Sequence, residues 1–314
     1  MRCPFLQGEN VAIKIVEYLL IDYNTQSITK TMINAKPLVS ITIPTFNSAK
    51  TLEKTLRSLR LQSYKQIEII VADGFSTDET LVIAKKYKAK ICFGRELAKA
   101  RNVAQKKAKG KYIFQLDSDQ FIAKDIIAKC VEVCEKKKYD ALVLNERSLV
   151  RKNAFIEKLL SYDKEVVSGS NDINPRFGAV IPRFFKTSIL RKMYWPENLS
   201  ILDDAIVFQK NKAILSNVGF LKDEGILHYE VYNFWIFFRK FRRYGRLYLS
   251  TLLTSPDTTL AHSLPRRAYF NKELIKKPNV FAGLLILYLL KGSAVSMGIV
   301  EELGHLFISS LKRL

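Results

Sequence analysis

The sequence is poor in cysteine and histidine, with four cysteines and three histidines in 314 residues. The cysteines show no paired spacing of the kind that builds a zinc site, and Cys130 and Cys134 are four residues apart on a predicted helix. Cysteines so placed are typical of small core residues, so we expect a reducing, intracellular setting instead of a disulfide scaffold. The first residues also lack the pattern of a signal peptide.

Acidic residues are outnumbered, with 30 Asp and Glu against 51 Lys and Arg, which gives a formal net charge of +21. This surplus predicts attraction to nucleic acid, an anionic membrane or a phosphorylated substrate, although a lysine-rich proteome would also produce it. No recognised nucleic-acid motif accompanies the charge, so a nucleic-acid partner is not expected. A hydrophobic content of 48% excludes a disordered chain.

Long hydrophobic runs are also scarce, and the one that matters covers residues 281–300. It is about long enough to cross a bilayer, but Lys291 lies in its middle, and glycines and serines dilute it. We therefore expect a helix that lies in or on a membrane, or packs against the rest of the protein, instead of a true span.

What the sequence does contain is a regular alternation of strand and helix patterns after residue 37. Predicted strands at 38–43, 67–72, 90–93 and 111–116 are separated by amphipathic helices, one of which we expect to begin at a capping box of Ser76 and Glu79. The alternation predicts an α/β fold with a mainly parallel sheet. Polar clusters at 45–47, 73–74 and 117–119 each follow a strand, so we expect them to meet at one edge of that sheet.

The last cluster, Asp117-Ser118-Asp119, presents two hard oxygen ligands at the tip of a buried strand. Such a pair suits Mg²⁺ or Mn²⁺ bridging a diphosphate, where the metal would neutralise charge on a departing nucleoside diphosphate. Ordinary turn and cap chemistry also places acids after strands. The position of this pair, after the fourth alternating strand, favours the functional interpretation.

Four motifs occur in order over residues 38–121: VSITIPTFN at 39–47, VADGFSTD at 71–78, ARN at 100–102, and GKY at 110–112 leading to LDSD at 116–119. Together they resemble the family-2 glycosyltransferases, and weaker similarity continues through residues 182–185, 203–204 and 228–229. The resemblance implies a GT-A fold, Rossmann-like with helices flanking the sheet. It also implies an enzyme that transfers a sugar from a nucleotide-activated donor with inversion at the anomeric carbon.

The resemblance further implies roles for individual residues. Asp73 would accept a hydrogen bond from the base, Asp117 would lie near the ribose or sugar, and Asp119 would bind the metal. Arg101 would face the diphosphate, and an ordinary exposed helix arginine is the alternative. The residues expected to bind the nucleotide sugar are Pro44, Thr45, Phe46, Asn47, Asp73, Arg101, Asp117 and Ser118.

An inverting transfer to a hydroxyl needs a general base opposite the leaving group. Relatives often carry it in a Glu-Asp pair that opens a helix, and Asp203-Asp204 stands at that place, so we assign the base to Asp204 with Asp203 as second choice. Helix N-capping is the alternative for one of these acids. His228 would be a further metal or diphosphate ligand beside Asp119 and Asp117, or else a structural histidine.

A helix predicted over residues 233–249 has aromatic residues on one side and arginines on the other. It could hold anionic lipid headgroups, bind single-stranded nucleic acid, or simply pack its aromatic side inward. Next to residues 281–300, contact with an anionic membrane is the economical explanation. We therefore expect a peripheral or interfacial protein on the cytoplasmic face of the cell membrane.

Together these observations predict three regions: an N-terminal extension (1–36), a GT-A catalytic domain (37–230) and a C-terminal helical region (231–314) that is expected to associate with the membrane. Within the catalytic domain, we expect the nucleotide-sugar half at 37–121 and the acceptor half at 122–230. The expected activity is metal-dependent transfer from a nucleoside-diphosphate sugar to a lipid-linked or cell-surface glycan. A polyprenyl-phosphate sugar synthase and a non-catalytic nucleotide-sugar or anionic-polymer binding module are the alternatives. Nothing in the sequence indicates an oligomeric state.

Overall fold

The structure is a computed structural model that describes residues 36–169, 181–270 and 272–311. The chain divides into two units, Met1–Pro37 and Leu38–Leu314. Nearly all described residues belong to the second unit, and the predicted extension over 1–36 lies outside them except for its last residue. The predicted boundary between 230 and 231 falls inside this second unit and stays a prediction.

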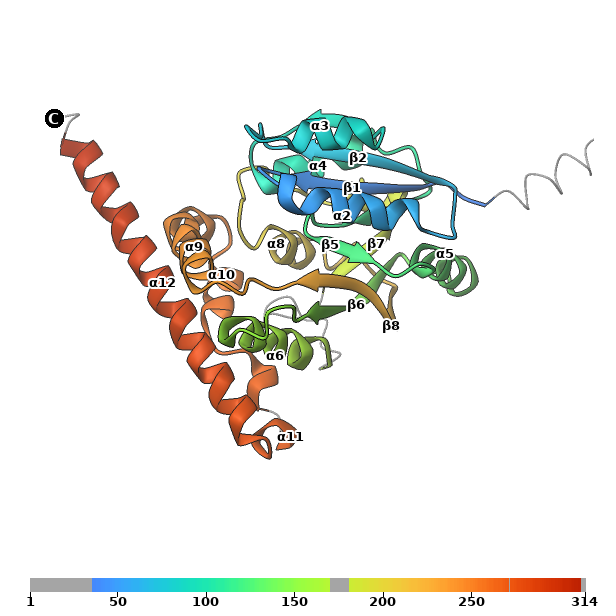
Figure 1. Cartoon of the computed structure of the whole chain (residues 1–314). Helices are drawn as coiled ribbons and strands as arrows, with labels where there is room; N and C mark the ends of the chain where they lie inside the picture. The colour runs from blue at the N-terminus through green and yellow to red at the C-terminus, as the bar shows by residue number, and fades with distance from the viewer. Residues whose placement is uncertain (1–35, 170–180, 271, 312–314) are drawn as a thin grey trace, which may run out of the picture. The chain divides into compact units, whose positions relative to one another are not determined.

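The centre of this unit is an eight-stranded sheet, counted over the described residues, with the order β3-β2-β1-β4-β7-β6-β8-β5 (Figure 1). Strands β1 to β4 run parallel, as the alternation predicts, whereas β7 is antiparallel to both of its neighbours. The strands are β1 (Val39–Thr45), β2 (Ile67–Asp73), β3 (Lys90–Phe93), β4 (Tyr112–Gln115), β5 (Gln120–Ile122), β6 (Ala141–Leu149), β7 (Pro182–Lys186) and β8 (Val218–Tyr229).

Helices cover both faces of the sheet, which confirms the predicted α/β class. One core joins the sheet to α2 (Ala49–Arg60), α3 (Thr80–Lys86) and α5 (Ile126–Lys137). A second core joins it to α4 (Leu97–Lys107), α7 (Thr187–Leu190) and α8 (Asp203–Lys210). Cys130 and Cys134 are buried free thiols in the first core, as their spacing predicts.

The predicted capping box at Ser76 and Glu79 is wrong. Helix α3 begins at Thr80, and Glu79 is the residue before it, with no side-chain cap. Ser76 instead donates from its backbone N and its hydroxyl to Asp73. The two residues have the spacing of a capping box, but Ser76 hydrogen-bonds to the buried carboxylate of Asp73, three residues earlier, instead of capping α3.

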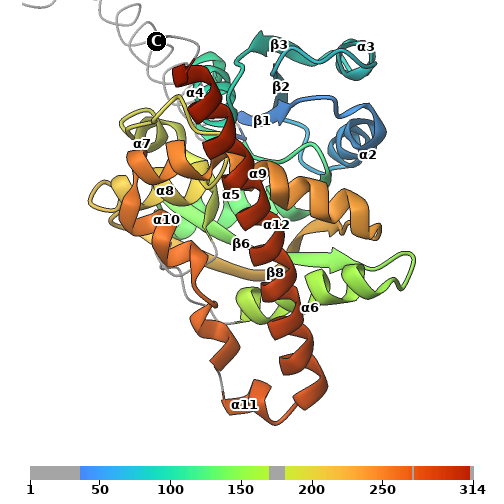
Figure 2. The same ribbon diagram turned by 90° about the vertical axis from the view of Figure 1, so that its left-hand side faces the viewer.

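The C-terminal part of the unit is helical. It consists of α9 (Phe234–Thr254), α10 (Pro256–Ser263), the short 3₁₀ helix η2 (Arg267–Phe270), α11 (Lys272–Ile275) and α12 (Pro278–Leu311), while α6 (Phe155–Gly169) joins it to the sheet. Figure 2 shows α12 running past both α9 and α6. Gly245 and Gly298 permit this approach, because a Cβ at Gly298 would overlap the backbone oxygen of Arg242.

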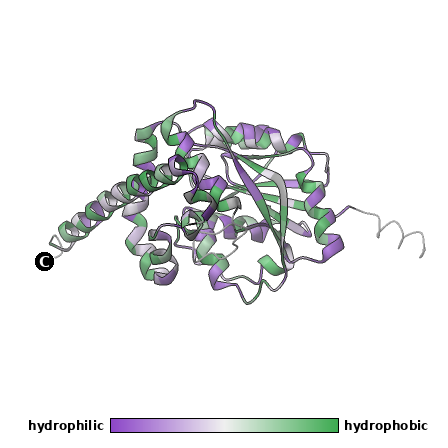
Figure 3. Cartoon of the chain, turned by 90° about the horizontal axis from the view of Figure 1, so that it is seen from below, coloured by the Kyte–Doolittle hydropathy of each residue, from purple (hydrophilic) through white to green (hydrophobic). Residues whose placement is uncertain are grey.

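Helix α12 is long and apolar enough to cross a membrane by length and composition alone, and 22% of its most apolar window is buried in the protein. Hydrophobic residues continue along its length in Figure 3. Its central lysine is not left in an apolar setting, because Lys291 Nζ lies 2.7 Å from Asp163 Oδ2 on α6. The lysine that interrupts the hydrophobic run therefore attaches the helix to the rest of the unit.

Candidate active site

The predicted polar clusters do meet at the carboxyl ends of β1, β2 and β4. Asp73 is fully buried at the end of β2. Its Oδ2 accepts from the hydroxyls of Thr45 at 2.8 Å and Ser76 at 2.7 Å, and its Oδ1 accepts from the backbone N of Ser76 at 2.7 Å. A carboxylate oxygen can accept two hydrogen bonds, so Oδ1 can take another donor, such as an N–H of a base.

Asn47 joins the two loops beside Asp73. Its Oδ1 accepts from the backbone N of Thr77 at 2.9 Å, and its own backbone N donates to Ser76 Oγ at 2.8 Å. Asn47 adopts a positive φ of 49°, a conformation that asparagine tolerates better than most residues. Phe46, next to it, is 56% exposed and follows Pro44 and Thr45 at the end of β1, where a nucleoside could contact its ring.

A second exposed aromatic ring lies in the same region. Phe75 is 52% exposed and has a φ of 67°, which is unusual for a bulky residue. Its ring stacks on Phe93 with centroids 5.4 Å apart, and the guanidinium of Arg95 lies 5.3 Å from the Phe75 centroid. Backbone strain of this kind is common at functional sites.

Arg101 is not an exposed helix arginine, because only 3% of its side chain is accessible. Its Nη2 donates to Asp117 Oδ1 at 2.8 Å, and its Nε lies 3.0 Å from Asp203 Oδ2. It thereby connects the acid after β4 with the first residue of α8. Although burial opposes ionisation, Arg101 and Arg183 together hold the pKa of Asp117 well below its usual range.

Arg183 on β7 is a site residue to which the sequence analysis assigned no role. Its Nη2 lies 3.3 Å from Asp117 Oδ2 and 3.6 Å from Asp204 Oδ2. One guanidinium therefore lies between the two acids that the sequence places on the donor and acceptor sides. The only sequence signal for Arg183 was the weak family similarity at 182–185. Its position in the site depends on the antiparallel pairing of β7 with β4, and local sequence patterns do not indicate such a long-range pairing.

Asp203 and Asp204 differ in accessibility. Asp203 is 2% exposed, and burial raises its pKa to about 6. The Asp204 side chain is 28% exposed, and its Oδ1 accepts from the backbone N of Ala205 at 2.8 Å. Leu202 is the N-cap residue of α8, so neither acid holds that position. A substrate hydroxyl can therefore reach Asp204 more readily than Asp203.

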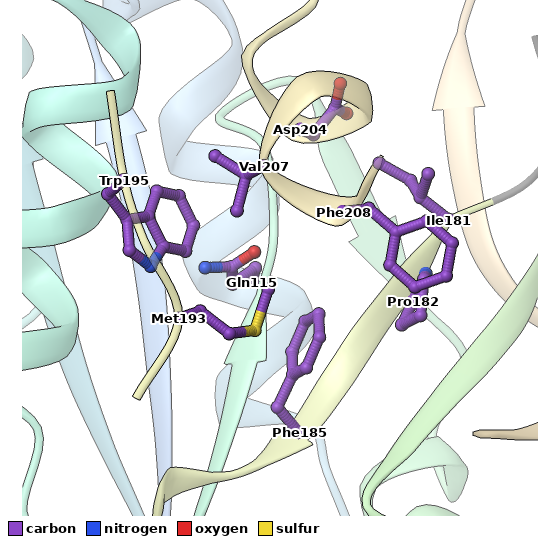
Figure 4. Close-up of a pocket in the computed structure, with 9 residues that line it drawn as sticks. All are labelled: Gln115, Ile181, Pro182, Phe185, Met193, Trp195, Asp204, Val207 and Phe208. Atoms are coloured by element: carbon purple, nitrogen blue, oxygen red, sulfur yellow. The ribbon is translucent and has the colours of Figure 1, made fainter. Parts of the chain in front are cut away.

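Behind Asp204 lies a small, mostly apolar cavity lined in part by Met193, Trp195 and Val207. Figure 4 shows the Asp204 carboxylate pointing away from these side chains. The apolar residues support α8 from behind, and the carboxylate is left on the opposite side.

Asp119 and His228 come together, as the sequence predicts. Asp119 Oδ2 lies 3.2 Å from His228 Nε2, and His228 Nδ1 lies 3.1 Å from Glu230 Oε1. Burial alone would lower the pKa of His228, but hydrogen bonds to Asp119 and Glu230 raise it to about 9. Glu230, which sequence reasoning did not select, is also bound by Lys164 at 2.9 Å.

These residues fit a divalent metal in their chemistry, since Asp119 supplies a hard oxygen and His228 an imidazole nitrogen whose ring Glu230 orients. In the described parts of the chain, no group of three or more His, Cys, Asp or Glu side chains is arranged as a metal site. Asp117, the third predicted metal ligand, forms ion pairs with Arg101 and Arg183, and its role at the metal stays a prediction. Ser118 Oγ donates to Ser48 Oγ at 2.9 Å and ties this loop to the start of α2.

A mixed sheet with helices on both faces, and an Asp-x-Asp loop at the carboxyl ends of its parallel strands, has the architecture of the GT-A fold. The family model for glycosyl transferase family 2 matches residues 40–200, about half of the chain. The chain belongs to this family.

Among curated proteins, the chain is similar to the poly(ribitol-phosphate) beta-N-acetylglucosaminyltransferase TarS of Staphylococcus aureus, with 26% identity over 199 residues, which is 59% of this chain and 34% of TarS. It is also similar to the UDP-Glc:alpha-D-GlcNAc-diphosphoundecaprenol beta-1,3-glucosyltransferase WfaP of Escherichia coli, with 41% identity over 107 residues, covering 32% of this chain and 43% of WfaP. The chain thus spans about a third of the length of TarS.

Two solved structures share the fold. TarS 1–349 of S. aureus in complex with UDP-GlcNAc aligns with a TM-score of 0.52 and 21% identity, covering 79% of this chain and 71% of that one. The mannosyltransferase PcManGT from Pyrobaculum calidifontis, in complex with GDP-Man and Mn²⁺, aligns with a TM-score of 0.53 and 18% identity, covering 86% and 88%. These similarities confirm the predicted GT-A fold.

Proposed function

We propose that this chain is an inverting, metal-dependent glycosyltransferase that moves a sugar from a nucleoside-diphosphate sugar to a lipid-linked or cell-surface glycan. One observation carries the proposal: Arg183 lies between Asp117, on the donor side, and Asp204, on the acceptor side, at 3.3 Å and 3.6 Å. A single arginine therefore bridges the acid assigned to the donor and the acid assigned to the acceptor. Direct transfer between two bound substrates needs the two sites to be this close.

The names of the relatives support this reaction class. WfaP is named for a UDP-Glc donor and a diphosphoundecaprenol-linked acceptor, and TarS for a poly(ribitol-phosphate) acceptor. The solved structure of TarS 1–349 holds UDP-GlcNAc, and that of PcManGT holds GDP-Man and Mn²⁺. Because the chain covers only part of the curated relatives, a nucleoside-diphosphate sugar donor and a cell-surface acceptor are our proposals for it.

On the donor side, Asp73 accepts a hydrogen bond from the base, and Phe46 contacts the nucleoside beside Pro44 and Thr45. Asn47 holds the two loops together through Thr77 and Ser76. Arg101 keeps Asp117 ionised and in place next to the sugar. Preorganised side chains of this kind lose little freedom when the donor binds.

Asp119 and His228 are the residues that would hold Mg²⁺ or Mn²⁺. A divalent ion bound there supplies charge neutralisation for the departing diphosphate. Glu230 fixes the ring of His228 through Nδ1, and this leaves Nε2 directed to Asp119. Carboxylates that orient ligating histidines are a common feature of metal centres.

On the acceptor side, Asp204 acts as the general base. It takes the proton of the acceptor hydroxyl while the hydroxyl oxygen bonds to the anomeric carbon, and the bond from that carbon to the diphosphate oxygen breaks. The nucleoside diphosphate leaves with the electron pair. Attack from the face opposite the leaving group inverts the configuration, and the 28% exposure of Asp204 lets an acceptor reach it.

We also propose peripheral association with the cytoplasmic face of the membrane. Large apolar side chains on α12 are exposed, among them Leu289 at 67% and Val300 at 68%. At the start of α9, Trp235 is 66% exposed and is followed by Arg239 and Arg243, which are exposed too. An apolar face flanked by aromatic and basic residues is typical of a protein that lies at an anionic interface.

The decisive experiment replaces Asp204 by asparagine and measures transfer and donor binding separately. A panel of nucleotide sugars is tested with Mn²⁺ for release of nucleoside diphosphate, and donor affinity is measured by calorimetry. We expect kcat to fall by about 10²-fold or more while the donor Kd stays unchanged, because only the base is lost. Asp125→Asn, at the exposed start of α5, is the matched control. Normal transfer by Asp204→Asn to a hydroxyl acceptor would remove Asp204 as the base.

A further inference from the structure

A cavity of about 310 Å³ opens beside the proposed base. Asp204 and Arg183 form part of its wall, so a molecule inside it touches the acid that would receive the acceptor proton. Leu160 on α6 lines another side, and Glu230 and Arg266 contribute from beyond residue 200. The cavity therefore depends on a part of the chain that follows the residues matched by the family model.

The basic residues of this cavity are already neutralised. Lys164 Nζ lies 2.6 Å from Glu146 Oε1 and 2.9 Å from Glu230 Oε1. Both carboxylates are therefore within ion-pair distance of the same lysine. Two negative charges thus face one lysine on this wall, which leaves no positive charge for an anionic ligand.

The other two cations of the cavity wall, Arg183 and Arg266, are also paired with carboxylates. Arg183 lies between Asp117 and Asp204, and Arg266 Nη1 lies 3.7 Å from Asp163 Oδ1. The cavity wall as a whole contains four carboxylates against three lysine and arginine side chains. A phosphate entering it would lose its hydration without gaining an unneutralised cation, which is costly.

The same wall suits a neutral molecule with many hydroxyl groups. The carboxylates that line it can accept hydrogen bonds from hydroxyls. Leu160 and Ala205 add apolar surface for the C–H face of a ring. A few directed polar groups on a partly apolar wall are typical of small-molecule sites.

We infer that this cavity binds the acceptor, and that the part of the acceptor it holds is a neutral sugar residue and not a phosphate. The inference rests on the proposed function, since it takes Asp204 as the base. The sugar hydroxyl forms the new bond to the anomeric carbon and gives its proton to Asp204, as the nucleoside diphosphate leaves. A lipid phosphate as the attacking group is thereby excluded, whereas a lipid-linked glycan is not.

The test fills the cavity without touching the charged residues. Leu160→Trp places an indole in it, and Leu61→Trp, at a 62% exposed leucine after α2, is the matched control. Neutral p-nitrophenyl hexosides serve as one set of acceptor probes, and hexose 1-phosphates with farnesyl phosphate as the anionic set. Release of nucleoside diphosphate without any acceptor reports the proposed function alone, independently of the cavity.

We expect the unmodified protein to transfer to a neutral probe and to no anionic one. Leu160→Trp should raise the acceptor KM about tenfold, because the indole takes the space of the sugar, with acceptor-free release and donor KM unchanged. Leu160→Phe, which adds less volume, should give a smaller rise and guards against misfolding. Faster transfer to the anionic probes, or an unchanged acceptor KM in both folded Leu160 variants, would overturn the inference. Absence of acceptor-free release from the unmodified protein would instead count against the proposed function.

Discussion

Replacing Lys291 by methionine tests how α12 is held against the rest of the protein. The substitution keeps the length and the apolar stem of the side chain but removes its charge. In the structure, Lys291 donates to Asp163 Oδ2 at 2.7 Å, and the Asp163 side chain is only 9% exposed. Tyr269 donates to the other oxygen at 2.6 Å, so Asp163 keeps one close partner in the variant.

The size of the effect follows from these distances. At an effective dielectric constant of about 20, unit charges 2.7 Å apart attract by roughly 6 kcal/mol. Desolvation of the pair offsets part of this, and breaking a buried pair by removing one partner costs about 3 to 5 kcal/mol. Arg266, 3.7 Å from Asp163, still compensates some of the charge. We therefore expect a loss near the lower limit, about 3 kcal/mol in the free energy of unfolding.

The loss should depend on pH. Burial would raise the pKa of Asp163, but Arg266 and Lys291 outweigh it and hold the pKa well below its usual range. A carboxyl whose pKa is lowered in the folded state stabilises the fold above about pH 4, and this contribution disappears as the pH falls further. Without Lys291 the carboxyl takes up a proton at higher pH, so the difference between variant and unmodified protein should shrink on acidification.

Urea unfolding followed by tryptophan fluorescence measures the effect, with Lys85→Met on the exposed side of α3 as the control. Adding Asp163→Asn to Lys291→Met should restore part of the lost stability, because no unpaired charge then remains buried. If Lys291→Met unfolds at the same urea concentration as the Lys85→Met control at pH 7, the pair does not hold α12 and the reasoning is refuted.

Three further outcomes are expected. Phe75→Gly should raise the melting temperature, since glycine relieves about 1 kcal/mol of strain at φ 67°. The same substitution should weaken nucleotide binding, measured by calorimetry. A lower melting temperature with unchanged binding would show that the ring has only a structural role. Asp119→Ala and chelation with EDTA should each abolish transfer, and Mn²⁺ should restore only the chelated protein; a chelator-resistant enzyme would disprove the metal assignment. Val300→Glu and Leu289→Glu together should reduce co-sedimentation with vesicles that contain anionic lipid, and unchanged sedimentation would contradict the membrane proposal.

Local patterns were enough to predict the sheet edge at which the site forms. Alternating strands and helices imply right-handed crossovers, and crossovers place Asp73 and Asp117 at the same ends of two parallel strands, β2 and β4, that flank β1. Nothing beyond the hydrophobic period and the polar residue after each strand was needed for this step. The interpretation of Cys130 and Cys134 as core residues succeeded for the same reason, since helical spacing indicates the buried face.

Long-range pairings could not be predicted in this way. Strand β7 lies between β4 and β6 and antiparallel to both, and only that placement brings Arg183 to Asp117. Lys291 was recognised as a break in an apolar run, but its partner Asp163 is 128 residues earlier on another helix. Glu230 contacts both Lys164 and His228 only because β8 pairs with β6, a pairing between distant parts of the sequence. Local periodicity contains no information about such partners.

Arg101 has a consequence for how substitutions combine. Its guanidinium binds Asp117 with one nitrogen and Asp203 with another, so the loop after β4 and the start of α8 share a single cation. The effects of changing Asp117 and Asp203 will therefore not add, because the first replacement frees Arg101 to bind the remaining acid more closely. Any redesign of the loop after β4 or of the start of α8 will therefore need substitutions on both elements, because a change in one alters the charge balance at the other.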